Sequence, residues 1–214
     1  MLPMAHLTGR FPLVISRRLV LATGMAGLAT YLARPALALV GPRQSEVAPG
    51  LMRRALGALE QHGARIEHHD AMGIADFSLP SSTPRFHVLD IASGRVSSHL
   101  VAHGRGSDPA HTGWLERFSN EPRSHATSAG AYRTDDVYEG AHGRSLRLAG
   151  LDASNSNAEA RAIVVHAAAY VSTEILLDHG VLGRSLGCFA LAHSSLEEVL
   201  ARLGPGRLIY ADKV

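Results

Sequence analysis

The residue types best suited to chemistry in this sequence are a thiol and an imidazole within residues 163–191, which read IVVHAAAYVSTEILLDHGVLGRSLGCFAL. The thiol belongs to Cys188, the only cysteine, and the imidazole belongs to His166, which lies 22 positions earlier in an apolar β-branched run. If the chain folds back between them, the imidazole can hold the thiol as a thiolate, the form that attacks a carbonyl carbon. The alternative is a buried structural cysteine, which is common in proteins generally.

The residues just before Cys188 favour an exposed nucleophile over a packed one. Gly187 permits a backbone geometry that other residues avoid, and it lets a substrate approach closely. Backbone N–H groups around such a turn can stabilise the oxyanion that forms when a thiolate attacks a carbonyl. The Ser185 hydroxyl is placed to position that carbonyl or to hold His166. No carboxylate lies close to either reactive residue in the sequence, so we expect a backbone carbonyl to orient His166.

The elements that position these residues are mostly short strands. The patterns predict a helix over residues 51–62 and a last helix opened by a capping box from Ser194 to Glu197. Residues 102–130 have little periodicity and suit either a substrate-binding loop or solvated coil. Strands are predicted over residues 74–79, 85–91, 95–102, 130–138, 145–148, 161–167 and 208–211. This order indicates an antiparallel β-rich domain, a sandwich or a half-open barrel.

The first 38 residues read as an export signal and not as part of the fold. Arg17 and Arg18 precede a weakly apolar stretch rich in Gly, Ala and Thr, and a small-x-small site ends at Ala38. This pattern resembles a twin-arginine signal, with residues 39–69 as a linker and N-terminal helix before a catalytic domain over residues 70–214. The alternative is a membrane anchor, but the apolar run of about 15 residues is short of the roughly 20 that span a bilayer.

The overall composition argues against two classes of function. The net charge is +2 with only 5% aromatic residues, and no basic patch with stacking aromatics appears, so we expect no nucleic-acid partner. The 13 histidines raise the alternative of a metal protein. However, no HExxH or paired CxxC motif is present, and zinc sites need three or four converging ligands, so no metal is expected.

Several separated motifs resemble the murein L,D-transpeptidase catalytic domain family, the YkuD_2 branch of the YkuD-like superfamily. They are FSLPSS at residues 77–82, LVAHGRGS at 100–107, RFSNEPRSH at 117–125, GRSLRLAGL at 143–151, and VVHAAAYVS at 164–172 leading to GVLGRSLGC at 180–188. The resemblance covers about residues 70–210. It implies a mainly β fold, the L,D-transpeptidase β-sandwich of mixed strands with a few short helices.

The resemblance also implies an activity. Such enzymes attack the carbonyl of the L-centre of diaminopimelate in a peptidoglycan stem peptide, release D-alanine, and pass the acyl group from a cysteine thioester to an amine. Carried over, Cys188 is the nucleophile and His166 the general base, and Ser185 and Gly187 belong to the same motif. Where the main branch has an arginine two residues after the cysteine, this chain has Ala190.

Further substrate-binding candidates lie in the matched motifs. Arg184 is a candidate for the substrate carboxylate, and His103, Arg105 and His125 are candidates for lining the cleft. No cofactor is implied. The expected location is the periplasm or cell envelope after export, without a stable membrane span once the signal is removed, and the oligomeric state is left open. The alternatives are an L,D-carboxypeptidase or amidase that uses the same Cys188 and His166, and an inactive murein-binding domain.

Overall fold

The structure is a computed structural model that describes residues 47–214. The predicted export signal and the first part of the linker lie outside the described residues. The helices are α1 (Pro49–His62), the 3-10 turn η1 (Gly63–Arg65), α2 (Thr173–His179) and α3 (His193–Arg202). The strands are β1 (Ala71–Asp76), β2 (Phe86–Asp90), β3 (Val96–His99), β4 (Val101–Ala102), β5 (Gly130–Gly140), β6 (Gly143–Gly150), β7 (Val164–Ala167), β8 (Phe189–Leu191) and β9 (Leu208–Asp212).

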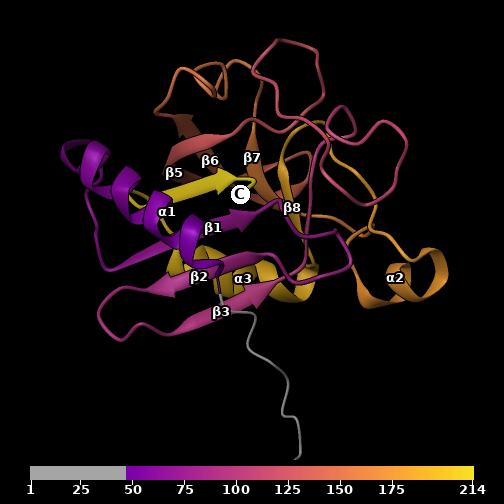
Figure 1. The fold of residues 1–214 in the computed structure, drawn as a ribbon, viewed down its shortest axis with the longest axis horizontal. Helices are drawn as coiled ribbons and strands as arrows, with labels where there is room; N and C mark the ends of the chain where they lie inside the picture. The colour runs from indigo at the N-terminus through magenta and orange to yellow at the C-terminus, as the bar shows by residue number, and fades with distance from the viewer. Residues whose placement is uncertain (1–46) are drawn as a thin grey trace, which may run out of the picture. The chain divides into compact units, whose positions relative to one another are not determined.

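The strands form one mixed sheet in the order β3-β2-β1-β9-β5-β6-β7-β8-β4 (Figure 1). Most neighbours are antiparallel, but β1 pairs with β9, and β7 with β8, in parallel. The expectation of an antiparallel sheet is therefore wrong for these two pairs. Parallel neighbours need a long crossover connection, which a local periodicity cannot reveal. The mainly β fold of mixed strands with a few short helices, implied by the family resemblance, is confirmed.

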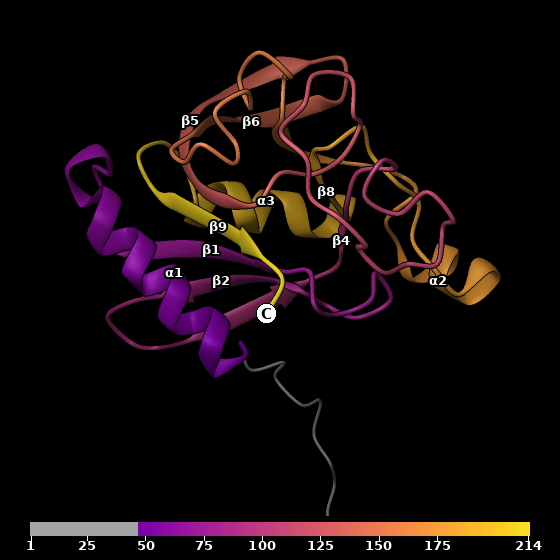
Figure 2. The ribbon, with the colours of Figure 1, turned by 45° about the horizontal axis from the view of Figure 1, so that its top comes forward.

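The sheet curls around a single interior helix. Only Leu100 separates β3 from β4, although these strands lie at opposite ends of the sheet order, so the curl brings the two ends together. Helix α3 lies between the two halves of the sheet (Figure 2). Its buried residues Leu196, Val199 and Leu200 share the main core with Phe86 of β2 and Phe189 of β8. Burial of these apolar side chains is the main stabilising contribution to the closed sheet.

Helix α1 covers the outer face of the β1–β9 half (Figures 1 and 2). Leu51 and Ala55 of α1 are fully buried and pack with Met72 and Ile74 of β1 and with Leu208 of β9. The predicted helix over residues 51–62 is thus confirmed, with two more residues at its start.

The predicted capping box at the start of α3 is wrong. The helix begins at His193, its N-cap is Ala192, and no side chain caps it. The predicted apolar face of the helix is nonetheless buried. Packing into the core therefore fixes the start of this helix without a contribution from a cap.

The long segment between β4 and β5 is irregular, as its sequence predicts. Between residues 103 and 129 the only ladder contact is a bridge from Gly104 to Ser185, which lies three residues before Cys188. The segment runs beside the β8 end of the sheet (Figure 2). It therefore packs directly against the part of the chain that carries the thiol.

Candidate active site

Cys188 lies directly before β8, at the end of a tight turn. Ser185 Oγ donates a hydrogen bond to the Cys188 carbonyl oxygen (2.7 Å) and accepts one from the Gly187 N–H (3.1 Å). Gly187 has φ of +122°, and a Cβ there would lie 2.8 Å from the Ala126 carbonyl oxygen. Because that conformation and that space both exclude a side chain, the turn requires glycine. The turn leaves Cys188 half-buried at its end.

His166 lies in β7 and is only 2% exposed. Its Nδ1 atom lies 2.8 Å from the carbonyl oxygen of Ala167. A carbonyl can only accept, so Nδ1 carries the proton and donates, which leaves the Nε2 lone pair free to take a proton. The expectation that a backbone carbonyl orients this histidine is confirmed.

The strand register brings the segments that carry the thiol and the imidazole side by side. In the parallel pair β7–β8, Val165 is opposite Phe189 and His166 is opposite Ala190. Cys188 directly precedes β8 and lies two residues before Ala190. The thiol and the imidazole are therefore carried by neighbouring segments at the β7–β8 pair.

The Cys188 Sγ atom contacts the carbonyl oxygen of Ala162 at 3.5 Å. Burial raises the pKa of Cys188, against the opposing effects of the Val164 N–H and the Arg161 charge. Burial also lowers the pKa of His166. Both shifts favour the uncharged forms of the thiol and the imidazole, so a base has to take the thiol proton before the sulfur can attack.

Arg161 is the cation beside the thiol, and the sequence analysis did not single it out. One guanidinium nitrogen, Nη1, donates to the Ser119 carbonyl oxygen (2.8 Å) and to Ser128 Oγ (2.7 Å). The other, Nη2, donates to the carbonyl oxygen of Ala126. Arg161 therefore ties the long loop to the thiol turn. Its position inside a predicted strand gave no sign of this, although a charged residue at the start of a buried run is itself unusual.

His142 is a second residue that the sequence analysis missed. It lies in the hairpin between β5 and β6, and its ring stacks on His166 with centroids 4.4 Å apart and planes 22° apart. Ser145 of β6 is opposite His166 in the sheet, which brings the hairpin over the imidazole. His142 adds a smaller lowering of the His166 pKa to the effect of burial.

Two predicted site residues, Arg105 and His125, pair with each other in the long loop. The Arg105 side chain reaches Nδ1 of the His125 ring at 3.1 Å. The Arg105 N–H donates to the Ser185 carbonyl oxygen (2.8 Å), and the Ser185 N–H donates to the His103 carbonyl oxygen (2.9 Å). The loop backbone therefore runs alongside the turn that precedes Cys188.

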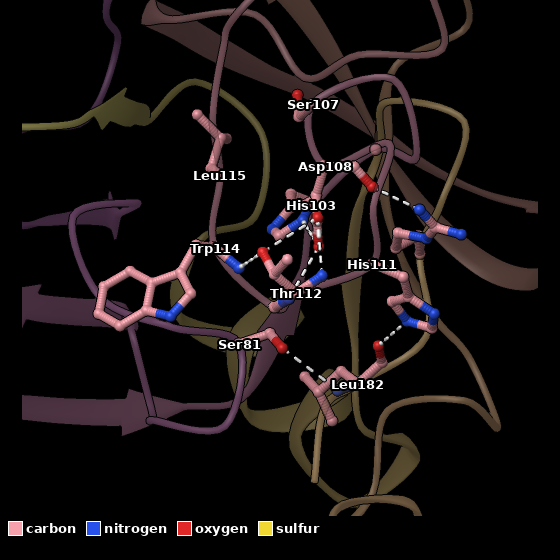
Figure 3. Close-up of polar contacts among 12 residues, drawn as sticks. Ser81, His103, Ser107, Asp108, His111, Thr112, Trp114, Leu115 and Leu182 are labelled. Carbon is pink, nitrogen blue, oxygen red and sulfur yellow. Dashed lines mark hydrogen bonds and ion pairs between the residues drawn. The ribbon is translucent and has the colours of Figure 1, made fainter. Parts of the chain in front are cut away.

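His103 belongs to a buried cluster around Asp108 (Figure 3). Its Nδ1 lies 2.7 Å from a guanidinium nitrogen of Arg85, which can only donate, so the Nε2–H points to Asp108 Oδ2 at 3.4 Å. Burial, with a contribution from the Arg85 charge, lowers the pKa of His103 to about 4. The neutral ring has both nitrogens occupied, and the Asp108 carboxylate also accepts from the Thr112 N–H at 2.8 Å.

Arg184 joins the same cluster. Its guanidinium donates to the carbonyl oxygen of Asp108. Figure 3 shows one further contact of the loop, to Leu182, and a contact from Leu182 to Ser81. His111 Nε2 lies 2.8 Å from the Leu182 carbonyl oxygen, and the Leu182 N–H donates to Ser81 Oγ (3.2 Å).

The predicted site residues therefore fall into two groups. The structure places His103 and Arg184 in the Asp108 cluster and groups the rest along the thiol turn, namely Cys188, His166, Ser185, Gly187, Arg105 and His125.

Two pockets flank the segment that accepts the thiol hydrogen bond. A cavity of about 420 Å³ is lined by Pro122, Arg123, His125, Ala160, Arg161 and Leu186. A smaller one, of about 120 Å³, is lined by Asp135, Tyr138, Arg147, Leu148, Glu159, Ala162, Ile163 and Val164. The two pockets therefore adjoin the segment from Ala160 to Val164, whose Ala162 carbonyl contacts the thiol.

Within residues 47–214, no three His, Cys, Asp or Glu side chains gather as metal ligands would. None of the helices in this described part has the length and apolar character that a membrane crossing requires.

None of the curated proteins matches this chain. Several solved structures do match it. An L,D-transpeptidase structure from Mycobacterium smegmatis has 15% identity over 67% of this chain and 58% of that one, with a TM-score of 0.40. Mycobacterium tuberculosis L,D-transpeptidase 1 has 15% identity over 66% and 60%, with a TM-score of 0.35. A mutant of the helical cell shape determining protein Pgp2 from Campylobacter jejuni has 13% identity over 78% and 57%, with a TM-score of 0.44. The chain spans less than two thirds of the length of each.

The family is established by a sequence model and not by these structures. The model of the L,D-transpeptidase catalytic domain, YkuD_2, matches residues 43–211, which include every helix and all but the last residue of the strands described above. The chain therefore belongs to the YkuD_2 family of L,D-transpeptidase catalytic domains.

Proposed function

We propose that this chain is a murein L,D-transpeptidase that uses Cys188 as nucleophile and His166 as general base on peptidoglycan stem peptides. The observation that supports the proposal is the β7–β8 register, in which His166 is opposite Ala190, two residues after Cys188. The family supplies the reaction class. The tautomer of His166, with Nε2 unprotonated, supplies the base.

The first half of the reaction forms a thioester. His166 Nε2 takes the proton of the Cys188 thiol, and the sulfur attacks the carbonyl carbon of the donor's L-centre. The bond from that carbon to the nitrogen of D-alanine then breaks, and the departing amine takes the proton from His166. Arg161 favours this half because its charge lowers the cost of the thiolate. The Gly187 N–H is already committed to Ser185 Oγ, so the oxyanion requires other donors.

The second half returns the enzyme to its resting state. An acceptor amine attacks the thioester carbon and gives up a proton to His166, and the released sulfur takes that proton as the new amide forms. Water in place of the amine gives hydrolysis, which is the carboxypeptidase alternative. The two pockets that adjoin residues 160–164 favour transfer, since a transferase binds two peptides. The N-terminal signal pattern supports action in the cell envelope after export.

The test is to incubate the full-length protein with a disaccharide tetrapeptide from murein and to follow intact protein mass and products. An adduct on Cys188 with loss of D-alanine, together with a cross-linked dimer, is the expected result. Tripeptide without dimer would instead assign a carboxypeptidase. Cys188→Ala is the control and should form no adduct while keeping its unfolding midpoint, because a half-buried thiol contributes little packing. An adduct on that variant would refute the role of Cys188.

A further inference from the structure

The larger of the two pockets beside the thiol has a cationic lining. It is bordered by Leu186, the exposed residue two before Cys188, and by Arg161, whose charge acts on the thiol. Arg123 and His125 of the long loop form the opposite part of the lining. A ligand in this pocket would therefore lie next to the turn that carries Cys188.

The positive charge of this pocket has no carboxylate partner among residues 47–214. Arg161 donates only to neutral oxygens, and Arg105 contacts the His125 ring. Arg123 is exposed and makes no hydrogen bond or ion pair with the described residues. The neighbouring acids Glu121 and Glu159 are also outside ion-pair distance of these three arginines.

Elsewhere in the described structure arginines are commonly neutralised. Five of them pair with a carboxylate, namely Arg54, Arg133, Arg144, Arg202 and Arg207. Charges of one sign in a recess without partners raise the local concentration of an oppositely charged ligand. The guanidinium group also matches the geometry of a carboxylate, which it binds through two parallel hydrogen bonds.

The backbone of this wall is held in an uncommon conformation. Arg123 and His125 have φ of 61° and 53°, in the left-handed region that favours glycine. The Gly106 N–H donates to the His125 carbonyl oxygen at 2.9 Å, and the His125 ring is held by Arg105. Such a conformation persists only where surrounding contacts fix it, so the wall of the pocket is preformed.

We propose that this pocket binds a free carboxylate of the donor peptide, other than the one that leaves with D-alanine. Arg123 is the direct ligand, Arg161 supplies the buried positive charge, and Leu186 contacts the apolar part of the same peptide. This inference rests on the proposed function, because the donor is the peptide whose carbonyl meets Cys188. The pocket therefore favours donor peptides with free carboxylates over amidated donor peptides.

The experiment measures acylation of the full-length protein without acceptor, by intact mass. Two donors are compared, the disaccharide tetrapeptide with free non-terminal carboxylates and the same peptide with those groups amidated. For the wild type, amidation should lower the acylation rate constant about 10-fold, the range of a lost charged hydrogen bond. Arg123→Gln should cause a similar loss with the free donor and little further loss with the amidated one. Arg53→Gln is the control, since Arg53 is exposed on α1 and makes no polar contact.

An Arg123→Gln variant that slows both donors equally, or neither, overturns the pocket assignment. A second measurement separates this outcome from a failure of the proposed function. Cys188→Ala protein is titrated calorimetrically with both peptides, with and without Arg123→Gln. Tighter binding of the free donor that depends on Arg123 supports the pocket even if the wild type forms no adduct. Equal binding of both peptides overturns it even if the wild type does.

Discussion

At the scale of single residues, the candidate site depends on the backbone conformation of Gly187 and on the tautomer of His166. The backbone at Gly187 turns where no side chain fits, and this presents Cys188 at the end of the turn. The Ala167 carbonyl fixes the proton of His166 on Nδ1. Both features could be anticipated from residue types, because glycine before a nucleophile and the lack of a nearby carboxylate are visible in the sequence.

Gly187→Ala should both destabilise the protein and inactivate it. A Cβ would lie 2.7 Å from Ile163 Cδ1 and 2.8 Å from the Ala126 carbonyl oxygen, at a φ of +122°. We expect a loss of about 1–3 kcal/mol in the free energy of unfolding, measured with urea, and no acylation. Gly57→Ala on α1 is the matched control, because nothing lies within 4 Å of its Cβ position. Gly57→Ala should raise the free energy of unfolding by about 0.5–1 kcal/mol. An equal loss of stability in both variants would contradict the argument.

His166→Gln should slow alkylation of Cys188 by iodoacetamide at neutral pH by tenfold or more. The reason is that burial holds the thiol pKa above its usual range, so a base is needed to form the thiolate. Above the thiol pKa the two proteins should react alike, because solvent hydroxide then removes the proton. His179→Gln, at the exposed end of α2, is the control. Equal rates for His166→Gln and the wild type at pH 7 would refute the pairing.

At the scale of elements, the site is a junction between a parallel strand pair and a long loop. The sequence predicted β7 and the irregular loop, but not the parallel register that sets His166 opposite Ala190, two residues after Cys188. It also missed Arg161 and His142, because each makes its contacts with segments far away in the chain. The contacts of His103 and Arg184 with Asp108 could not be read from their motif positions, because they depend on how the loop folds.

Substitutions of Arg161 should separate its two effects. One is to hold the long loop through hydrogen bonds, and the other is to stabilise the Cys188 thiolate through its charge. Arg161→Gln should raise the pKa of Cys188 further, read from alkylation against pH, and increase amide hydrogen exchange in residues 119–128. Arg161→Lys keeps the charge and loses the planar fork. Arg161→Lys should therefore keep the thiol pKa closer to its wild-type value than it keeps the hydrogen exchange of residues 119–128. If both variants change both readouts equally, the two roles are not separable.

At the scale of the whole molecule, the sheet closes around α3, and several histidines are buried in the fold. Burial lowers the pKa of His87, His99, His103 and His166. The sequence predicted a β-rich fold, but the 13 histidines showed no pattern that separates buried from exposed ones. The sequence also did not reveal the two parallel strand pairs. Strand pairing and histidine burial both depend on how distant parts of the chain fold together.

Acid should therefore destabilise the fold well above the titration range of its carboxylates. The unfolded chain binds a proton at His103 below pH 6.5, whereas the folded chain does so only near pH 4. Stability is thus complete above pH 6.5 and falls as the pH drops toward 4, by on the order of 2–3 kcal/mol for His103 alone. Urea unfolding at pH 7 and pH 5 measures this. His103→Gln should be less stable at pH 7 but lose less between the two pH values, and an unchanged loss would contradict the assignment.

The place of β9 has a consequence for how the protein is made. This strand follows all the others in the chain, yet it pairs with β1 on one side and with β5 on the other. During translation, both of those strands therefore keep an open edge until residues 208–212 have left the ribosome. Open edges invite pairing with other chains, so a stalled or shortened product would be prone to aggregation. The sheet can be completed only after synthesis has passed this strand, which follows Cys188 in the chain.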